Sequence, residues 1–421
     1  MVTKKRLVKK LNKKLRQLKL PRGVKLLPLL ALLAVVGISY GASSKKVTIT
    51  PERLQTYAKN IVEVCRSEAY RPACYDREIP KLTDKISMEQ AFQVTSLVQE
   101  KDPSYTYCHV LGHELSAQEV RKDPVSWKDV VSRCPSGLCS NGCIHGGFQE
   151  KFRAETFTDQ QIAEVLPDLK TICEDRDTWH PTGLEQGSCY HAVGHLTMYL
   201  TGADINKSLL LCDQAAKKSD QRDYAPVCYD GVFMQIFQPL EPEDFALVKG
   251  QEQTKDTVSS FCDNFSEVPR AHCWNESWPL FYKEILTPDG LVRHCSRLTG
   301  ALEDRCYNGL FFVITAQNNL SSEKMLAFCS GLPQNRRGSC FGGSAARMIE
   351  TDYRNIAKAV EFCGRAQSAD PDQGCYQELV RYSTFNFHAR SPQFYELCNA
   401  LPETWQEKCL SKQNGQNNPS N

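Results

Sequence analysis

The histidines of this 421-residue chain are the residues whose type and spacing best suit chemistry. There are only nine, and four of them form two copies of the pattern H-x-x-G-H, His109 with His113 and His191 with His195. Residues i and i+4 lie on one face of a helix, so each pair can converge on a single point. A fifth histidine, His145 in CIHGG, lies between the two pairs in the sequence.

These spacings favour a bound transition-metal ion. Neutral imidazole is a good ligand for zinc, copper, iron and nickel, and three or four imidazoles with an open position permit hydrolysis or oxygen chemistry. The repeat register described below also aligns Asp230 with three of the histidines, so its carboxylate could complete or orient the ligand shell. We therefore predict a zinc, copper or iron site whose ligands come from His109, His113, His145, His191, His195 and Asp230.

Polar residues beside the histidines are expected to support this site. Gln149 occupies the register position of the second histidine of each pair. Glu114 and Glu150 are nearby acids that could orient a ligand or act as a general base, and Glu185 is a third.

Two other interpretations of the histidines stay open, namely helix capping with packing, and catalysis without a metal. The metalloprotease pattern H-E-x-x-H and the haem-attachment pattern C-x-x-C-H are both absent. The remaining histidines are isolated and are expected at the surface or as helix caps: His180, His272, His294 and His388.

A repeat built on the 20 cysteines must position these side chains. In each unit a helical run ends in Cys, a short polar loop follows, and a second Cys precedes an aromatic residue, as in CYDGVF from Cys228. From Cys273 onward the second cysteines recur at steps of 33, 34, 35 and 34 residues. This period is typical of αα-hairpins stacked into a solenoid. We predict an all-α solenoid of disulfide-stapled αα-hairpin repeats.

The spacing also predicts how the cysteines pair. A bridge from the end of one helix to the first turn of the next contributes up to about 3 kcal/mol in the chain-entropy model. Cys108 and Cys139 are left over and form either a tenth bridge or two free thiols. The predicted pairs are Cys65–Cys74, Cys134–Cys143, Cys173–Cys189, Cys212–Cys228, Cys262–Cys273, Cys295–Cys306, Cys329–Cys340, Cys363–Cys375 and Cys398–Cys409.

In its architecture the chain resembles the Sel1-like, cysteine-rich helical repeat proteins, whose hairpins are also joined by disulfides. The resemblance covers the plan of residues 51–412 and no individual motif. It implies an exported helical scaffold that contacts another protein, and it assigns no role to any residue.

The N-terminus predicts export. Residues 1–25 form a basic cytoplasmic tail, residues 26–42 are uncharged, and residues 43–50 are a linker. Seventeen residues span about 26 Å as a helix, which is near the lower limit for a bilayer. The basic flank places the N-terminus in the cytoplasm and the body outside. We predict a transmembrane signal anchor, with a signal peptide cleaved near residue 42 as the alternative.

Charge separates the body from nucleic-acid-binding proteins. Residues 1–51 hold 13 of the 51 basic residues and no acid, so the rest carries 38 basic and 49 acidic residues, a net charge of −11. Such a body repels phosphates. It divides into His-bearing repeats at 51–235, scaffold repeats at 236–412 and a disordered tail at 413–421.

The preferred function is therefore a membrane-anchored, exported helical-repeat protein with a metal site in its N-terminal repeats and a protein partner. One alternative is a metal-dependent hydrolase or oxidase that uses the histidine cluster. The other is a purely structural protein-binding solenoid with capping histidines.

Overall fold

A computed structural model describes residues 49–135, 137–152, 156–217, 223–240 and 242–414. The helices considered below belong to one compact unit, which begins at Pro51. The predicted basic tail, membrane anchor and most of the linker lie outside the described residues. Among the residues that are described, no helix is both long and apolar enough to span a bilayer.

The described residues contain helices and no β-strand, which confirms the predicted all-α class. The first half of the unit contains α3 (Pro51–Cys65), α4 (Arg71–Glu78), η1 (Pro80–Asp84), α5 (Met88–Lys101), α6 (His109–Lys122), α7 (Trp127–Ser132), η2 (Cys139–Asn141), α8 (Gly142–Phe152), α9 (Asp159–Thr171), α10 (Gly183–Thr201), α11 (Ile205–Ala216) and α12 (Ala225–Phe237).

The second half continues with shorter helices around the 34-residue repeats. It contains α13 (Pro242–Leu247), α14 (Val258–Cys262), α15 (Glu267–Glu276), η3 (Trp278–Phe281), α16 (Tyr282–Ile285), α17 (Pro288–Cys295), α18 (Ala301–Gln317), α19 (Ser322–Ser330), α20 (Gln334–Thr351), η4 (Tyr353–Asn355), α21 (Ile356–Ala366), α22 (Gly374–Asn386), α23 (Pro392–Ala400), α24 (Glu403–Leu410) and η5 (Ser411–Asn414).

Disulfides join the two helices of each repeat. The structure contains all nine pairs expected from the spacing, with sequence separations of 9 to 16 residues. It also joins Cys108 to Cys139 across a separation of 31, so no cysteine is free. A Cys-based nucleophile is therefore absent.

Local sequence sets where several helices begin. Ser87, Thr158 and Thr182 each accept a hydrogen bond from the backbone three residues later, and the residue there bonds back to the cap. These reciprocal bonds satisfy backbone N–H groups that a helix leaves unpaired. In α10 the returning side chain is Glu185, which is buried and bonds to the Thr182 N–H at 2.7 Å. Glu185 thus caps the start of α10, and its carboxylate is not positioned as a general base for the cluster.

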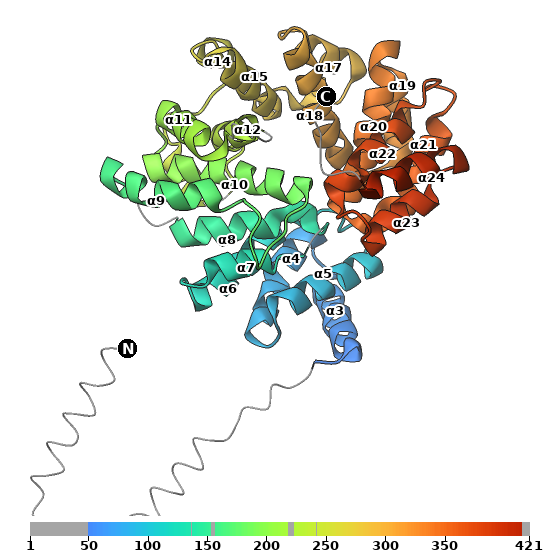
Figure 1. Cartoon of the computed structure of the whole chain (residues 1–421). Coiled ribbons are helices and arrows are strands. Elements are labelled where there is room, and N and C mark those ends of the chain that lie inside the picture. Colours follow the sequence, from blue (N-terminus) through green and yellow to red (C-terminus); the bar gives the residue numbers. More distant parts are fainter. Residues whose placement is uncertain (1–48, 136, 153–155, 218–222, 241, 415–421) are drawn as a thin grey trace, which may run out of the picture. The chain divides into compact units, whose positions relative to one another are not determined.

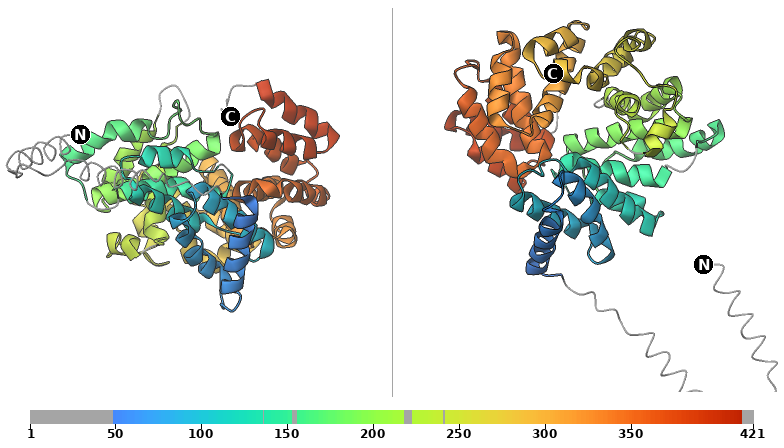
Figure 2. Two further views of the ribbon diagram at one scale, coloured as in Figure 1. Left: turned by 90° about the horizontal axis from the view of Figure 1, so that it is seen from below. Right: turned by 180° about the vertical axis from the view of Figure 1, so that it is seen from behind.

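The second helices of successive repeats form a continuous inner row. Helices α6, α8, α10, α12, α15, α18, α20 and α22 each pack against the next (Figure 1). The first helices, such as α9, α11, α19 and α21, pack on the outside of this row (Figure 2). The histidines thus lie on neighbouring helices of one layer.

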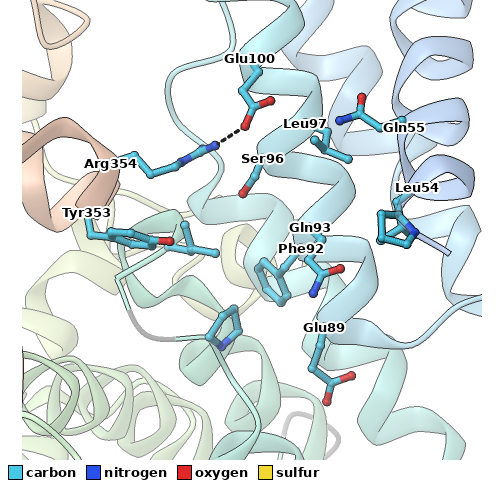
Figure 3. Close-up of a pocket in the computed structure, with 13 residues that line it drawn as sticks. Leu54, Gln55, Glu89, Phe92, Gln93, Ser96, Leu97, Glu100, Tyr353 and Arg354 are labelled. Atoms are coloured by element: carbon cyan, nitrogen blue, oxygen red, sulfur yellow. Dashed lines mark hydrogen bonds and ion pairs between the residues drawn. The ribbon is translucent and has the colours of Figure 1, made fainter. Parts of the chain in front are cut away.

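The row curves until its late helices contact its early ones. Helix α22 packs against α10, and Leu138 forms an isolated antiparallel bridge with Asp352. Arg354 pairs with Glu100 of α5 at 3.0 Å. Figure 3 shows this pair beside a pocket that Tyr353 and Arg354 line together with residues of α3 and α5. The bridge between Leu138 and Asp352 thus lies next to Cys139, whose carbonyl oxygen contacts the His109 ring.

Candidate metal centre

Helices α6, α8 and α10 bring five histidines into one cluster. The His145 ring is central: its centroid lies 4.9 Å from that of His109 and 5.1 Å from that of His113. It also lies 5.4 Å from His191 and 6.0 Å from His195. Four of the five side chains are buried, and His191 is half-buried. The structure therefore brings together all five histidines predicted from sequence.

Glycines explain why histidines on different helices come so close. A Cβ atom at Gly146 would lie 2.0 Å from the backbone oxygen of His113, and one at Gly194 would lie 2.0 Å from that of Cys228. Only a residue without Cβ permits this approach of α6 to α8 and of α10 to α12. The glycine of H-x-x-G-H is one of these contact positions.

Each H-x-x-G-H pair presents two facing nitrogens. The Nε2 atoms of His109 and His113 are 3.0 Å apart, and those of His191 and His195 are 3.2 Å apart. Two imidazole nitrogens this close could both reach one metal ion at ordinary metal–nitrogen bond lengths of about 2.0–2.1 Å.

Backbone carbonyls set the tautomer of His109. Its Nδ1 atom lies 3.2 Å from the oxygen of Ser140 and 3.3 Å from that of Cys139, so Nδ1 carries the proton and donates it. The Nε2 atom of His109 is then a lone-pair donor. The two carbonyls point inward because Cys139, Ser140 and Asn141 all have left-handed backbone conformations, with φ of 50°, 48° and 57°. The bridge from Cys108 to Cys139 holds this loop against α6.

Three of the histidines meet a simple distance test for a metal site. Ligand atoms of His109, His113 and His145 all lie within 4.8 Å of one another. A small cavity of about 10 Å³ adjoins them. Its lining residues are His109, His113, His145, Gln149, His195, Met234, Gln235, Gln238, Leu240 and Asp244.

Burial lowers the pKa of every histidine in the cluster. The pKa of His109 falls to about 4, with Arg347 contributing. For His113, His145 and His191 the neighbouring imidazoles contribute as well, because two protonated rings repel each other. All five rings are consequently neutral at pH 7, which is the form that binds a metal ion.

The other predicted site residues lie in different surroundings. Gln149 lines the cavity and forms a side-chain hydrogen bond with His113. Glu114 and Glu150 instead form ion pairs with Arg121, at 3.0 Å and 3.7 Å, along the outer flank of α6 and α8. They share the helices of the cluster but not its face.

Asp230 is also placed elsewhere. Its carboxylate accepts a hydrogen bond from Nδ1 of His272 at 2.5 Å, and Arg305 contacts the other nitrogen of that ring at 3.1 Å. The register comparison aligned Asp230 with the histidines, but Gln235 is the α12 residue that bonds to the cluster, and the Asp230 carboxylate pairs with His272 instead. Its partner, His272, comes from α15 of the next repeat.

Two histidines expected at the surface are buried, which corrects the prediction. His272 is 1% exposed and His294 is 3% exposed, whereas His180 and His388 are exposed as expected. Nε2 of His294 donates to the Trp274 carbonyl at 3.3 Å, and Nδ1 accepts from Arg297 at 3.3 Å. One proton therefore satisfies both nitrogens of the neutral ring.

Because the buried His294 ring is neutral, we expect the protein to lose free energy of unfolding in acid. Burial and Arg297 lower the pKa of His294 to about 4, below its unfolded value of about 6.5. The unfolded chain therefore takes up the proton first, and stability present above pH 6.5 is lost as the pH falls toward 4. The variant His294→Gln keeps a donor and an acceptor but cannot titrate. When the pH falls from 7 to 4.5, the free energy of unfolding of the parent should drop by about 2–3 kcal/mol more than that of His294→Gln.

Urea unfolding with intact disulfides, at both pH values, measures this difference. The exposed His180→Gln variant is the control, and its pH dependence should match the parent. An equal acid loss in His294→Gln and the parent would contradict the prediction.

Sequence reasoning missed two polar residues of the site. Nδ1 of His195 and Oε1 of Gln235 are 2.7 Å apart, and Gln235 is 2% exposed. Asp244 is buried in the cavity wall, where it accepts hydrogen bonds from Tyr199 and from the Leu240 N–H. The register comparison pointed to the neighbouring Met234 on α12 and gave no signal for Gln235.

Comparison with known proteins finds no match: no family model, no curated protein and no solved structure is similar to this chain. The function must therefore be inferred from the geometry of the site.

Proposed function

We propose that this protein binds a transition-metal ion, zinc, copper or iron, at its buried histidine cluster. The proposal depends on one observation: Nε2 of His109 faces Nε2 of His113 at 3.0 Å while backbone carbonyls accept the Nδ1 proton of His109. Buried polar atoms that face each other without a partner are costly. An ion held by both nitrogens, with His145 as a third ligand, removes that cost.

A metal-free cluster would need a different hydrogen-bond pattern. His113 would have to donate Nε2–H to His109, and its other nitrogen would then need a donor. Gln149, which bonds to His113, is the group that would have to supply this donor. The metal-free pattern in the first pair thus requires the Gln149 amide nitrogen to face His113.

The compartment supports the same function. Ten disulfides indicate an oxidising environment, and the uncharged segment 26–42 with its basic flank supports a membrane tether with the helical unit outside the cytoplasm. Glu114 and Glu150, the acids that the sequence offered as general bases, form ion pairs with Arg121 and do not face the cluster. We therefore propose metal binding and assign no catalytic step to these two residues.

The direct test is elemental analysis of the full chain, produced in an oxidising compartment and purified without a His tag. We expect at least one bound transition-metal ion per chain after incubation with metal and removal of the excess. A chain that stays metal-free under these conditions contradicts the proposal.

Paired variants locate the ion. Replacing His113 and His195 together by Ala should abolish bound metal and leave the helical circular dichroism signal intact. The matched control replaces the exposed His180 and His388 and should keep the full metal content. Loss of helical structure in the first variant, with metal-free parent protein, would support a packing role instead.

A further inference from the structure

Two adjoining cavities lie in the later repeats. The first, of about 430 Å³, is lined by residues of α12, α15, α18 and α22, and the second, of about 630 Å³, by residues of α18, α20, α22 and the loop before α22. Asn308 of α18 lines both of them, so the two cavities meet at this side chain. Each volume lies in the range of about 300–1,000 Å³ that is usual for small-molecule sites. None of the five clustered histidines lines either cavity.

The cavities are built on the register position that carries histidines in the earlier repeats. His145 and His191 each follow the second cysteine of their repeat by two residues. Asn275, Asn308 and Gln377 occupy the same position in later repeats, and all three line the cavities. The inner row of helices therefore gathers imidazoles at one site and side-chain amides at another.

Several of these amides have hydrogen-bonding groups to spare. Nδ2 of Asn275 donates to Glu276 at 2.9 Å, while its Oδ1 is buried without a partner among the described residues. Within the described part of the chain, the side chains of Asn308, Gln334 and Asn335 form no hydrogen bond. An amide group both donates and accepts, as a hydroxyl group does. This lining therefore suits a ligand that is rich in hydroxyl groups.

The charge of the cavities disfavours an anionic ligand. Together they are lined by five carboxylates and three arginines, a net charge of −2, which repels phosphate and carboxylate groups. Several of these charges already have partners in the protein. Glu378 forms an ion pair with Arg381 at 2.6 Å, and the Asp370 carboxylate accepts a hydrogen bond from the Cys375 N–H at 2.8 Å. A neutral ligand meets no such repulsion and leaves these contacts intact.

One wall of the first cavity is aromatic. Phe312 and Tyr382 both line it, with ring centroids 6.4 Å apart and ring planes at 47°, and both side chains are half-buried. Aromatic rings attract C–H groups to their electron-rich faces, and a sugar ring presents C–H groups of this kind beside its hydroxyls. The rest of the lining is mostly polar. A protein segment, in contrast, is usually anchored by large side chains that fill well-packed pockets.

We propose that the two cavities together bind a neutral oligosaccharide. Its hydroxyl groups bond to the amides, and one sugar ring packs against Phe312 and Tyr382. Asn308 lies where the cavities meet, so it contacts two successive sugar units. This site goes beyond the proposed metal centre and needs no ion there.

Isothermal titration calorimetry of the full chain tests the proposal. The probes are four neutral oligosaccharides: maltohexaose, cellohexaose, mannohexaose and chitohexaose. We expect at least one of them to bind with a Kd of about 1 mM or tighter. Binding of none of the four overturns the proposal. A serine hexapeptide represents the protein-segment alternative, and tighter binding of this peptide than of every oligosaccharide would overturn the proposal as well.

A matched pair of variants locates the site. Asn308→Ala removes hydrogen-bonding groups from both cavities and should weaken the binding of the oligosaccharide at least tenfold. Asn399→Ala removes an exposed amide on α23, outside both cavities, and should bind as the parent does. Equal affinity in the two variants contradicts the assigned site. Asn308 is exposed, so its replacement should leave the circular dichroism signal and the thermal unfolding of the parent unchanged.

Discussion

Replacing Gly194 by Ala is expected to lower the free energy of unfolding by about 3 kcal/mol or more and to weaken metal binding, because His195 lines the same cavity as His109 and His113. The new Cβ would lie 2.0 Å from the Cys228 carbonyl oxygen and 2.9 Å from the Cα atom of Gly231. Both neighbours are backbone atoms, so relief requires α10 and α12 to separate. That separation moves His195 away from Gln235. Urea unfolding with intact disulfides and elemental analysis measure the two effects.

Gly187 supplies the control on the same helix. Nothing lies within 4 Å of a Cβ built there, so Gly187→Ala should be neutral or stabilise the protein by up to about 1 kcal/mol through helix propensity. Its metal content should equal that of the parent. If Gly194→Ala matched Gly187→Ala in stability, the close backbone approach could not be what holds α10 and α12 together.

Removing the bridge between Cys108 and Cys139 is the second change with a large expected effect. The bridge closes the longest loop of the ten, with a separation of 31 residues, and the chain-entropy model assigns it about 4 kcal/mol. Its loss also releases a loop in which Ser140 and its neighbours have left-handed conformations that cost of order 1 kcal/mol each. The carbonyls that orient His109 would turn away, so a Cys108→Ala, Cys139→Ala variant should lose metal affinity as well as stability.

The bridge between Cys398 and Cys409 gives the comparison. Its separation is 11 residues, so the same model assigns it about 3 kcal/mol, and it lies far along the chain from the cluster. The matching double-Ala variant should lose comparable stability but bind the parental amount of metal. Equal metal binding in the two variants would show that the loop at Ser140 does not support the site.

Local patterns predicted most of the fold. Runs of apolar residues at helical spacing and cysteines 9 to 16 residues apart fix each helix pair, because both act over one hairpin. The tenth bridge could not be assigned, since Cys108 and Cys139 are joined across a longer stretch that the repeat does not specify. The missed burial of His272 and His294 has the same origin, because burial of an isolated side chain depends on neighbouring repeats.

The sequence by itself determined that five histidines would share one register and one face, because i, i+4 spacing and a cysteine-defined repeat are properties of the chain. Tertiary structure decided which polar groups meet them. It places Gln235 beside His195 and the carbonyls of Cys139 and Ser140 beside His109. It also pairs Asp230 with His272, outside the cluster. The physical reason is that backbone contact at glycines sets the distance and angle between neighbouring helices. Residue spacing along the chain does not predict these distances to within a few ångströms, and hydrogen bonds between side chains depend on them.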